Sequence, residues 1–318
     1  MTHVFLGAPS NTHAVVVGGG IMGADIAVVL LRAECQTIVV EPNETRHAAA
    51  RTQIHDNLKA IGREASIKFL SFAKSIDDID WASTQLMIEC VPEKLDIKQA
   101  LFKRLDALAP ETTVLASNSS SFAIRQIAEG CTTLQRMIGL HFFMPAHLVP
   151  LVEVIHGPGM LPVLAEELTA FMRRCGCVPI QVRRDAPGFI GNRLQHALGR
   201  EAFSLIQDGV ATAEDIDNAV RFGFGFRYLA AGPVLQKEHA GLDTHAAAAA
   251  TIYPSLSNVS QPPAVLADKP RQNKLGMKTG EGFYAWTDES IAVEKARYNQ
   301  ALRAALQILA NDLPPIEP

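Results

Sequence analysis

A glycine-rich turn between an apolar run and a helical pattern constrains the fold of this chain more than any other feature. Gly18, Gly20 and Gly23 form the pattern G-x-G-x-x-G after the run HAVVV and around the start of the segment IMGADIAVVLL. In such a turn the first glycine permits the tight bend, the second lets a pyrophosphate approach the backbone, and the third lets helix and strand pack closely. The helix N-terminus then faces the phosphate charge. The sequence therefore predicts a dinucleotide-binding βαβ unit.

The residue that ends the next predicted strand indicates which dinucleotide is bound. The run QTIVV is followed by Glu41, at about the distance from the glycines at which such units carry an acid. A carboxylate there can accept hydrogen bonds from both ribose hydroxyls and repels a 2′-phosphate. We therefore expect NAD, and not NADP, as the cofactor.

Short apolar runs alternate with helical patterns through the first half of the chain. This alternation is typical of βαβ units around a mostly parallel sheet. From about residue 185 the pattern changes to amphipathic helices and glycine turns, beginning with a long helix that we expect to start at Pro187. The sequence thus predicts an α/β fold: a Rossmann-type, doubly wound, mostly parallel sheet in residues 1–185, of which 1–12 form a loose tail, and an all-α domain in residues 186–318.

Composition and charge exclude several classes of partner. The formal net charge is −4 and the 29 Lys and Arg residues form no basic stripe, so nucleic acid is not an expected partner. No apolar run approaches the length of a membrane span. The five cysteines are scattered without CxxC or zinc-type spacing, which predicts reduced thiols and no metal site. Because the N-terminus shows no signal-peptide pattern, we expect a cytoplasmic protein.

One histidine and one glutamate stand inside apolar runs that are typical of buried strands. His141 lies in the run GLHFF, and Glu153 lies in PLVEVIH. A carboxylate in a buried strand is costly unless something pairs with it. If the two strands are neighbours, Glu153 can hydrogen bond to the imidazole, fix its tautomer and raise its basicity. Taken alone, His141 is better interpreted as a structural histidine with a satisfied ring.

Two polar segments offer further site residues. The segment SNSSS, residues 117–121, follows a predicted strand, and ligands of open parallel sheets bind beyond the carboxyl ends of the strands. The segment PGFIGNRL, residues 187–194, opens the long predicted helix and places Asn192 in its first turns. Both segments supply hydroxyl or amide groups that can hold a polar ligand.

Seven segments of the chain occur in an order found in one known family. They are the glycine turn with Met22, IECVPEKLDIKQALF, ASNSSSF, GLHFFMP, LVEV, PGFIGNRL and KLGMKTGEGFY. On these segments the chain resembles the L-3-hydroxyacyl-CoA dehydrogenase family from residue 14 to about residue 286. Seven ordered segments are far more specific than any one of them.

The resemblance implies a role for each candidate residue. His141 matches the catalytic base of the family and Glu153 its partner, while Ser120 and Asn192 match the residues that hold the reacting oxygen of the substrate. A further set matches cofactor contacts, on the nicotinamide side or in the tail of the chain: Glu93, Lys98, Ser120 and Lys278. The implied reaction is hydride transfer from a secondary alcohol to NAD while His141 takes the hydroxyl proton.

Departures from the family pattern bear on the substrate. Met144 stands where the family usually has Asn, and a thioether cannot replace the hydrogen bonds of an amide. The stretch after Glu41 is shorter than the arm that holds the CoA nucleotide in acyl-CoA enzymes. The segment GFGFRYLAAGP, residues 223–233, is closer to the lambda-crystallin (gulonate dehydrogenase) and carnitine dehydrogenase branch, and its Arg227 can pair with a substrate carboxylate. We therefore expect a small 3-hydroxy acid or a related hydroxy-carboxylate as substrate.

The sequence also allows other interpretations of substrate and function. A CoA thioester such as 3-hydroxybutyryl-CoA is the alternative substrate, and a non-catalytic, crystallin-like NAD-binding protein is the alternative function. The β-hydroxyacid dehydrogenases related to 6-phosphogluconate dehydrogenase use a lysine base on a later helix, whereas the matching helix here has arginines and no lysine. Apolar residues such as Phe203, Leu205 and Ile206 exceed what one short bundle needs, so we expect a homodimer through the helical domain.

Overall fold

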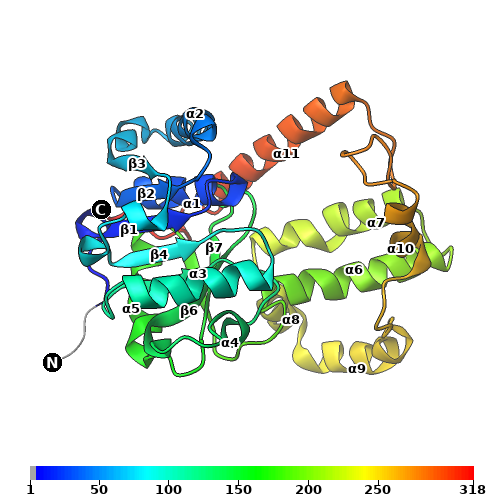
Figure 1. Cartoon of the computed structure of the whole chain (residues 1–318). Coiled ribbons are helices and arrows are strands. Elements are labelled where there is room, and N and C mark those ends of the chain that lie inside the picture. Colours follow the sequence, from blue (N-terminus) through cyan, green and yellow to red (C-terminus); the bar gives the residue numbers. More distant parts are fainter. Residues whose placement is uncertain (1–4) are drawn as a thin grey trace. The chain divides into compact units, whose positions relative to one another are not determined.

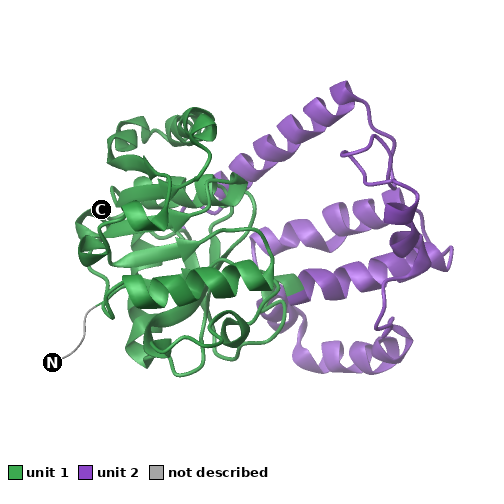
Figure 2. Cartoon of the chain, in the orientation of Figure 1, with its two compact units in different colours: residues 1–192, 312–318 green, residues 193–311 purple. Residues whose placement is uncertain are grey.

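The computed structural model, described for residues 5–318, divides into two compact units (Figure 2). Unit 1 comprises Met1–Asn192 together with Asp312–Pro318, and unit 2 comprises Arg193–Asn311. The sequence places the division a few residues earlier, at 185/186. It also does not predict the return of the last residues to unit 1.

Unit 1 is built around one eight-stranded sheet with the strand order β3-β2-β1-β4-β5-β6-β7-β8 (Figure 1). Its strands are β1 (His13–Val17), β2 (Gln36–Val40), β3 (Leu70–Ala73), β4 (Leu86–Glu89), β5 (Val114–Ser117), β6 (Met137–Phe142), β7 (Leu151–Ile155) and β8 (Val178–Val182). Neighbouring strands run parallel except β6 and β7, which are antiparallel. The strand order reverses between β1 and β4, which is the point of such sheets where dinucleotides bind. The predicted Rossmann-type fold is confirmed.

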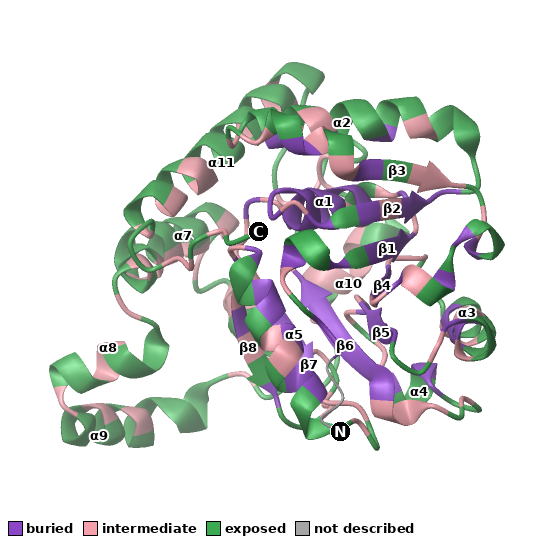
Figure 3. Ribbon diagram, turned by 90° about the vertical axis from the view of Figure 1, so that its left-hand side faces the viewer, coloured by how far each residue is buried: buried purple, intermediate pink, exposed green. Residues whose placement is uncertain are grey.

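Alternate residues of each central strand pack against different helices. The helices of unit 1 are α1 (Ile21–Leu31), α2 (His47–Lys59), α3 (Leu95–Leu108), α4 (Ile124–Ile127) and α5 (Pro162–Arg174). In β1, Val16 belongs to a core cluster with residues of α1, α2 and α5, whereas Val15 and Val17 belong to a second cluster with residues of α3 and α4. The strands are therefore buried on both faces (Figure 3), which explains their continuous apolar runs.

The N-terminal segment differs from the prediction of a loose tail. Phe5 and Leu6 are buried in the core of unit 1, and their backbone N–H groups donate to Glu167 Oε2 on α5 at 2.7 and 3.1 Å. Residues Pro9–Asn11 form a short 3₁₀ helix, η1. Residues 5–12 are thus fixed by apolar burial and by one carboxylate. Residues 1–4 of the predicted tail lie outside the described part of the chain.

Two further predictions about local structure were wrong or incomplete. The sequence did not predict β3, because this edge strand has four residues and only Leu70 is buried. The long helix does not start at Pro187. Gly188 and Phe189 have φ of 75° and 49°, a left-handed backbone that a helix cannot include, so α6 begins at Gly191.

The C-terminal segment returns to unit 1 after unit 2 is complete. Ile316 forms an isolated antiparallel β-bridge with Cys175, and the N–H of Glu317 donates to the carbonyl of Arg174 at 2.9 Å. The side chain of Ile316 packs against the core of unit 1. Both described ends of the chain therefore contact α5 or the residues that follow it.

Unit 2 is helical, as predicted for the second domain. Its helices are α6 (Gly191–Gln207), whose first two residues belong to unit 1, α7 (Ala213–Asn218), α8 (Pro233–Ala240), α9 (Leu242–Ile252), α10 (Ala264–Arg271) and α11 (Asp288–Ile308), with a π-helical stretch, η7 (Ala219–Gly225), after α7. Thr212 caps α7 through its hydroxyl, which accepts from the N–H of Asp215. None of residues 193–311 is buried (Figure 3). No helix within residues 5–318 combines the length and the apolar character needed to cross a bilayer.

Candidate active site

The glycine turn lies between β1 and α1 and has the geometry that its pattern predicts. Gly18 has φ 114°, and a Cβ there would lie 2.6 Å from the carbonyl oxygen of Cys90. A Cβ on Gly23 would lie 1.8 Å from the carbonyl oxygen of Gly18, which no side chain can tolerate. Nothing lies within 4 Å of a Cβ built on Gly20, so the backbone of the turn is open on that side. The turn therefore leaves space for a ligand at the N-terminus of α1.

A pocket of about 720 Å³ lies beyond the carboxyl ends of β1, β2 and β4. Its wall includes the glycine turn, Glu41 and Met144. Three cationic side chains also line it: Arg46, Lys74 and Arg104. Glu41 is buried, with Oε1 accepting from the N–H of Asn43 at 3.1 Å and Oε2 lying 3.4 Å from Arg46 Nη1. Open backbone amides, a helix N-terminus and one acid at the end of β2 together suit a dinucleotide.

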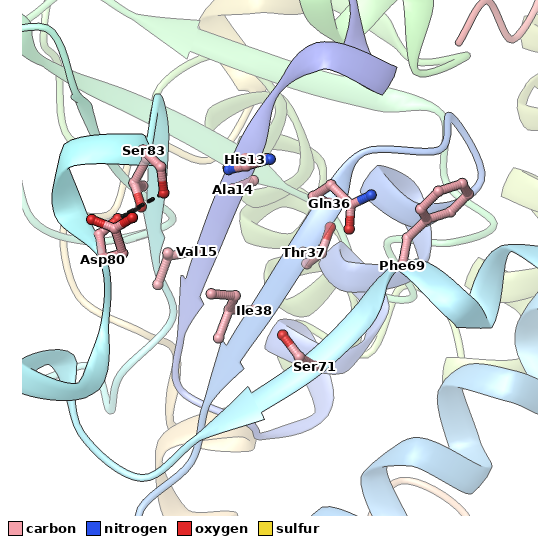
Figure 4. Close-up of a pocket in the computed structure, with 11 residues that line it drawn as sticks. His13, Ala14, Val15, Gln36, Thr37, Ile38, Phe69, Ser71, Asp80 and Ser83 are labelled. Carbon is pink, nitrogen blue, oxygen red and sulfur yellow. Dashed lines mark hydrogen bonds between the residues drawn. The ribbon is translucent and has the colours of Figure 1, made fainter.

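A second, smaller pocket of about 180 Å³ lies at the opposite ends of the first strands (Figure 4). Its lining includes His13 and Gln36, the first residues of β1 and β2, together with Asp80. It contains none of the predicted site residues. Because ligands of open parallel sheets bind at the carboxyl ends of the strands, the larger pocket, which is lined by Gly18, Gly20 and Glu41 but not by His141, is the candidate cofactor site.

His141 and Glu153 lie directly opposite each other in the antiparallel pair of β6 and β7. The imidazole Nδ1 is 2.8 Å from Glu153 Oε2, which confirms that the two side chains meet. The side chains are almost inaccessible, at 6% for His141 and 0% for Glu153. Glu153 Oε1 accepts from the N–H groups of Ile190 and Gly191, each at 2.9 Å. Both oxygens of the buried carboxylate are thus satisfied, which removes the cost of placing it in a strand.

The contacts of His141 and Glu153 determine which tautomer the neutral imidazole adopts. Burial acts to raise the pKa of Glu153, but the hydrogen bonds that it accepts outweigh this effect and hold the pKa below its usual value. An ionised carboxylate can only accept, so the neutral ring of His141 carries its proton on Nδ1 and its lone pair on Nε2. The rings of Phe143 and Phe189 flank the imidazole, with centroids 4.6 and 5.5 Å from its own. The neutral ring is therefore held in the tautomer whose unprotonated nitrogen is Nε2.

The segments that carry Ser120 and Asn192 are attached to the same pair. The loop after β5 is tied to the residue next to His141, because Asn118 Oδ1 accepts from the N–H of Phe142 at 2.9 Å. Asn192 directly follows the two residues whose N–H groups Glu153 binds. Glu153 therefore contacts both the imidazole and the start of α6. Neither Ser120 nor Asn192 is fully buried, and within residues 5–318 neither side chain makes a hydrogen bond.

The remaining predicted residues lie in two different surroundings. Lys98, at 1% exposure, lies in α3 with its ammonium 2.6 Å from Glu89 Oε1 and 3.1 Å from Glu93 Oε2. Arg227 and Lys278 belong to unit 2, in the short 3₁₀ helix η8 (Phe226–Leu229) and in the turn between α10 and α11. Both are exposed.

Several buried polar residues of unit 1 were not among the residues predicted from the sequence. Glu89 ends the buried strand β4, and the signal that identified Glu153, an acid in an apolar run, could have found it. Asp25 is buried in α1, where Oδ2 accepts from the N–H of Ala146 at 3.2 Å. Oδ1 of Asp25 lies 2.9 Å from His147 Nδ1, although the two are not aligned for a hydrogen bond. These contacts attach the segment after β6 to the helix that begins at the glycine turn.

Comparison with known families identifies both parts of the chain. The family described as 3-hydroxyacyl-CoA dehydrogenase, NAD binding domain, matches residues 13–186, and that described as 3-hydroxyacyl-CoA dehydrogenase, C-terminal domain, matches residues 188–286. Together they cover most of the chain and leave α11 and the C-terminal segment outside the match. The resemblance inferred from the seven segments is confirmed.

Individual relatives span most of this chain. The 5-formyl-3-hydroxy-2-methylpyridine 4-carboxylate 5-dehydrogenase of Mesorhizobium japonicum is 31% identical over 300 residues, 92% of this chain and 97% of that protein. The mitochondrial hydroxyacyl-coenzyme A dehydrogenase of Homo sapiens is 36% identical over 292 residues, 86% of this chain and 91% of that protein. The L-carnitine dehydrogenase of Pseudomonas sp is 32% identical over 71% of this chain and 72% of that protein.

Solved structures show the same relationship. The structure of the 5-formyl-3-hydroxy-2-methylpyridine 4-carboxylic acid 5-dehydrogenase, described as an NAD+-dependent dismutase, superposes with a TM-score of 0.87 at 29% identity, over 94% of this chain and 98% of that one. The (S)-3-hydroxybutyryl-CoA dehydrogenase from Ralstonia eutropha gives a TM-score of 0.72 at 27% identity, over 87% and 99%. With the fold and the dinucleotide pocket, these matches show that the chain belongs to the 3-hydroxyacyl-CoA dehydrogenase family and is an NAD-dependent dehydrogenase acting on CH–OH groups.

Proposed function

We propose that this dehydrogenase oxidises an alcohol carbon of a small free carboxylate, with His141 as the general base. Nε2 of His141 takes the proton of the substrate hydroxyl, and the resulting imidazolium is stabilised through Nδ1 by Glu153. NAD, when bound, accepts the hydride from the same carbon. Ser120 and Asn192 donate hydrogen bonds to the reacting oxygen and stabilise its negative charge, an electrostatic contribution. The observation that supports these roles most directly is the 2.8 Å contact between the buried imidazole and carboxylate.

For the cofactor we propose the contacts that the pocket and the family pattern suggest. Gly18, Gly20 and Gly23 leave the backbone of the turn open to the pyrophosphate, and Glu41 accepts from the ribose hydroxyls. The family pattern further assigns cofactor contacts on the nicotinamide side and in unit 2: Glu93, Lys98, Ser120 and Lys278. Glu41 also explains the choice of NAD, because its buried carboxylate would repel a 2′-phosphate.

Two observations favour a free hydroxy-carboxylate over a CoA thioester. A relative that aligns over almost the whole of both chains is named for a pyridine carboxylate, and a solved structure of a dehydrogenase with the corresponding name superposes better than that of a 3-hydroxybutyryl-CoA dehydrogenase. Exposed Arg227, which has no side-chain partner among the described residues, can bind a carboxylate bidentately. The 36% identity with a hydroxyacyl-CoA enzyme favours the thioester, which stays the alternative substrate.

A substrate panel tests this proposal. NADH formation would be followed with NAD and 3-hydroxybutyrate, L-carnitine, L-gulonate and hydroxymethyl-pyridine carboxylates, beside acetoacetyl-CoA in the reverse direction. We expect one of the free acids to exceed the thioester in kcat/KM by about tenfold or more, the low end of the discrimination that contacts in a substrate pocket provide. Arg227→Met should raise KM for that acid, and NADP should not replace NAD. Efficient acetoacetyl-CoA reduction would instead favour the thioester, and no turnover of any compound would favour a non-catalytic NAD-binding protein.

We also propose a homodimer formed through unit 2. Large apolar side chains of this unit face solvent, among them Phe222 at 68% and Val234 at 78% exposure. No residue of unit 2 is buried, so this unit has no buried apolar core of its own to stabilise its fold. Docking of a second copy on these exposed apolar side chains would bury them and stabilise both copies. Sedimentation equilibrium should give a dimer, and Phe222→Asp with Val234→Asp should weaken it, whereas Val163→Asp on α5 of unit 1 should not. A stable wild-type monomer at micromolar concentration would contradict the proposal.

A cytoplasmic location is proposed from the thiols. All five cysteines are free, and burial raises the pKa of Cys35 to about 12 and that of Cys177 above its usual value. Such thiols stay protonated and inert, in keeping with a reducing compartment. Recovery of the protein from a secreted or periplasmic fraction would count against this location.

A further inference from the structure

A buried carboxylate in α1 binds the segment between β6 and β7. Asp25, two residues after Gly23, is only 2% exposed. Its Oδ2 accepts from the N–H of Ala146 at 3.2 Å, and its Oδ1 accepts from the side-chain amide of Asn57 in α2 at 3.4 Å. One carboxylate thus connects α1, α2 and the segment that joins β6 to β7, residues 143–150.

His147 is the third neighbour of this carboxylate. Its Nδ1 lies 2.9 Å from Asp25 Oδ1, and the side chains of His147 and Asp25 are 11% and 2% exposed. This Nδ1 is buried and has no hydrogen-bond partner among residues 5–318. A buried polar atom without a partner is costly, and so is a buried carboxylate whose hydrogen bonds are as long as those of Asp25. Because a rotation of the imidazole can turn an N–H toward Oδ1, each group can remove the cost of the other.

The anchored segment carries one exposed side chain into the wall of the larger pocket. Ala146 and Leu148 belong to the core of unit 1, and the N–H of Leu148 donates to the carbonyl of Pro145 at 3.0 Å. Met144, by contrast, is 64% exposed and lines the pocket. Since the turn is compact and packed into the core, the contact of Ala146 with α1 determines where Met144, two residues earlier, lies in the pocket wall.

We propose that Asp25 is a positioning residue for NAD binding: together with His147 it anchors the segment between β6 and β7 to α1, and so holds Met144 against the dinucleotide. The same helix begins at the glycine turn, so one element carries both the backbone amides that face the pyrophosphate and the anchor of Met144. The inference rests on the dinucleotide pocket of the proposed function and does not depend on which substrate the enzyme oxidises.

The chemistry of Met144 explains why its position has to be fixed. A thioether is at most a weak acceptor, so its contribution to binding comes from apolar surface that the cofactor covers. Ile21, at the start of α1, lines the same pocket and is also 64% exposed. Dispersion between two atoms falls steeply once they separate beyond contact. A displaced segment would therefore forfeit the contact of Met144 while leaving that of Ile21 in place.

Hydrogen exchange of the backbone amides tests the anchor directly. Mass spectrometry would compare the peptide that covers residues 143–150 in the wild type and in Asp25→Ala. Loss of the charged acceptor should speed exchange of this segment by about tenfold. Asp25→Asn keeps an oxygen acceptor for the N–H of Ala146 and should stay near the wild type. Asp56→Ala, which removes an exposed acid of α2, is the matched control and should change nothing.

Cofactor affinity tests the link between the anchor and Met144. Fluorescence titration should show the Kd for NADH raised by about five- to tenfold in Asp25→Ala and in Met144→Ala, and near the wild-type value in Asp25→Asn. In a Met144→Ala background, Asp25→Ala should cost almost nothing more, because its effect passes through the missing side chain. His147→Leu weakens the same anchor without a change in α1, so it should raise the Kd in the same direction even if Asp25→Ala folds poorly.

A purely structural role for Asp25 would give different results. Ile54→Val removes a methyl group from a fully buried side chain of α2, so it should lower the melting temperature without raising the Kd for NADH. If Asp25→Ala behaves in the same way, the positioning role is wrong.

Other outcomes would also overturn the inference. Additive losses in the cycle of Asp25 and Met144 would show that Asp25 does not act through Met144, and unchanged hydrogen exchange in Asp25→Ala would remove the anchor. These measurements use no substrate, so they decide the inference even if the enzyme oxidises none of the panel compounds. A wild type that does not bind NADH would contradict the dinucleotide pocket and, with it, this inference.

Discussion

His141→Ala is expected to lower kcat by about 10²- to 10⁴-fold, the range that a positioned general base contributes, while NADH binding survives. The imidazole belongs to β6, and Nε2 is its free nitrogen because Nδ1 is bound by Glu153. Among the hydrogen bonds of the described residues, His141 supplies the one side-chain partner of that carboxylate. Steady-state kinetics with the best panel compound and fluorescence titration of NADH measure the two effects.

A control substitution at a second histidine distinguishes the loss of a general base from the loss of side-chain packing. His156 follows β7 and pairs with Gln181 at the sheet margin, so His156→Ala should retain normal turnover. Thermal unfolding of both variants shows whether the cavity left at residue 141 weakens the fold. Unchanged turnover in His141→Ala would end its assignment as the base.

Glu153→Gln is expected to lower kcat by about 10²- to 10⁴-fold, because the amide reverses the tautomer of the imidazole. The carbonyl of the glutamine takes the two backbone N–H groups that Glu153 Oε1 now binds, and the NH₂ group then faces His141 Nδ1. Nδ1 must accept, so the ring proton moves to Nε2 and blocks the base. NADH binding should not change, and a rate within twofold of the wild type would contradict this role for Glu153.

The same variant should alter how stability depends on pH. The folded-state pKa of Glu153 is depressed, so the unfolded chain binds its proton at higher pH than the folded chain does. The carboxylate therefore contributes stability above the usual carboxyl range, and this contribution is lost as the pH falls through the folded-state pKa. Thermal unfolding between about pH 3 and pH 7 should show a smaller acid-side decrease for Glu153→Gln than for the wild type.

The sheet and its dinucleotide turn could be predicted because each depends on local sequence. Strands buried on both faces give apolar runs, and Gly18 and Gly23 occupy positions where a Cβ would collide with backbone. The start of α6 could not be predicted, since the pattern does not reveal the left-handed backbone of Phe189. The return of Ile316 to unit 1 depends on a contact with Cys175, which is far away in sequence.

The candidate site was only partly accessible to sequence reasoning. His141 and Glu153 could be paired because a buried acid needs a partner and neighbouring strands bring residues into register. The contacts of Lys98 could not be derived, because they depend on how long side chains from α3, β4 and the following loop extend toward one another. The family resemblance indicates that Lys98 lies near the cofactor, but it does not identify the carboxylates that the Lys98 ammonium contacts.

The return of the C-terminal segment makes unit 2 an insertion within unit 1, with one end continuous with Asn192 and the other with Asp312. A single backbone break in an exposed loop such as that around Val259 would therefore release neither piece. One fragment would stay covalently continuous with the sheet, and the other would end in the segment that docks beside Arg174. From this topology alone, we expect that a single proteolytic cut within unit 2 does not release a fragment from the protein.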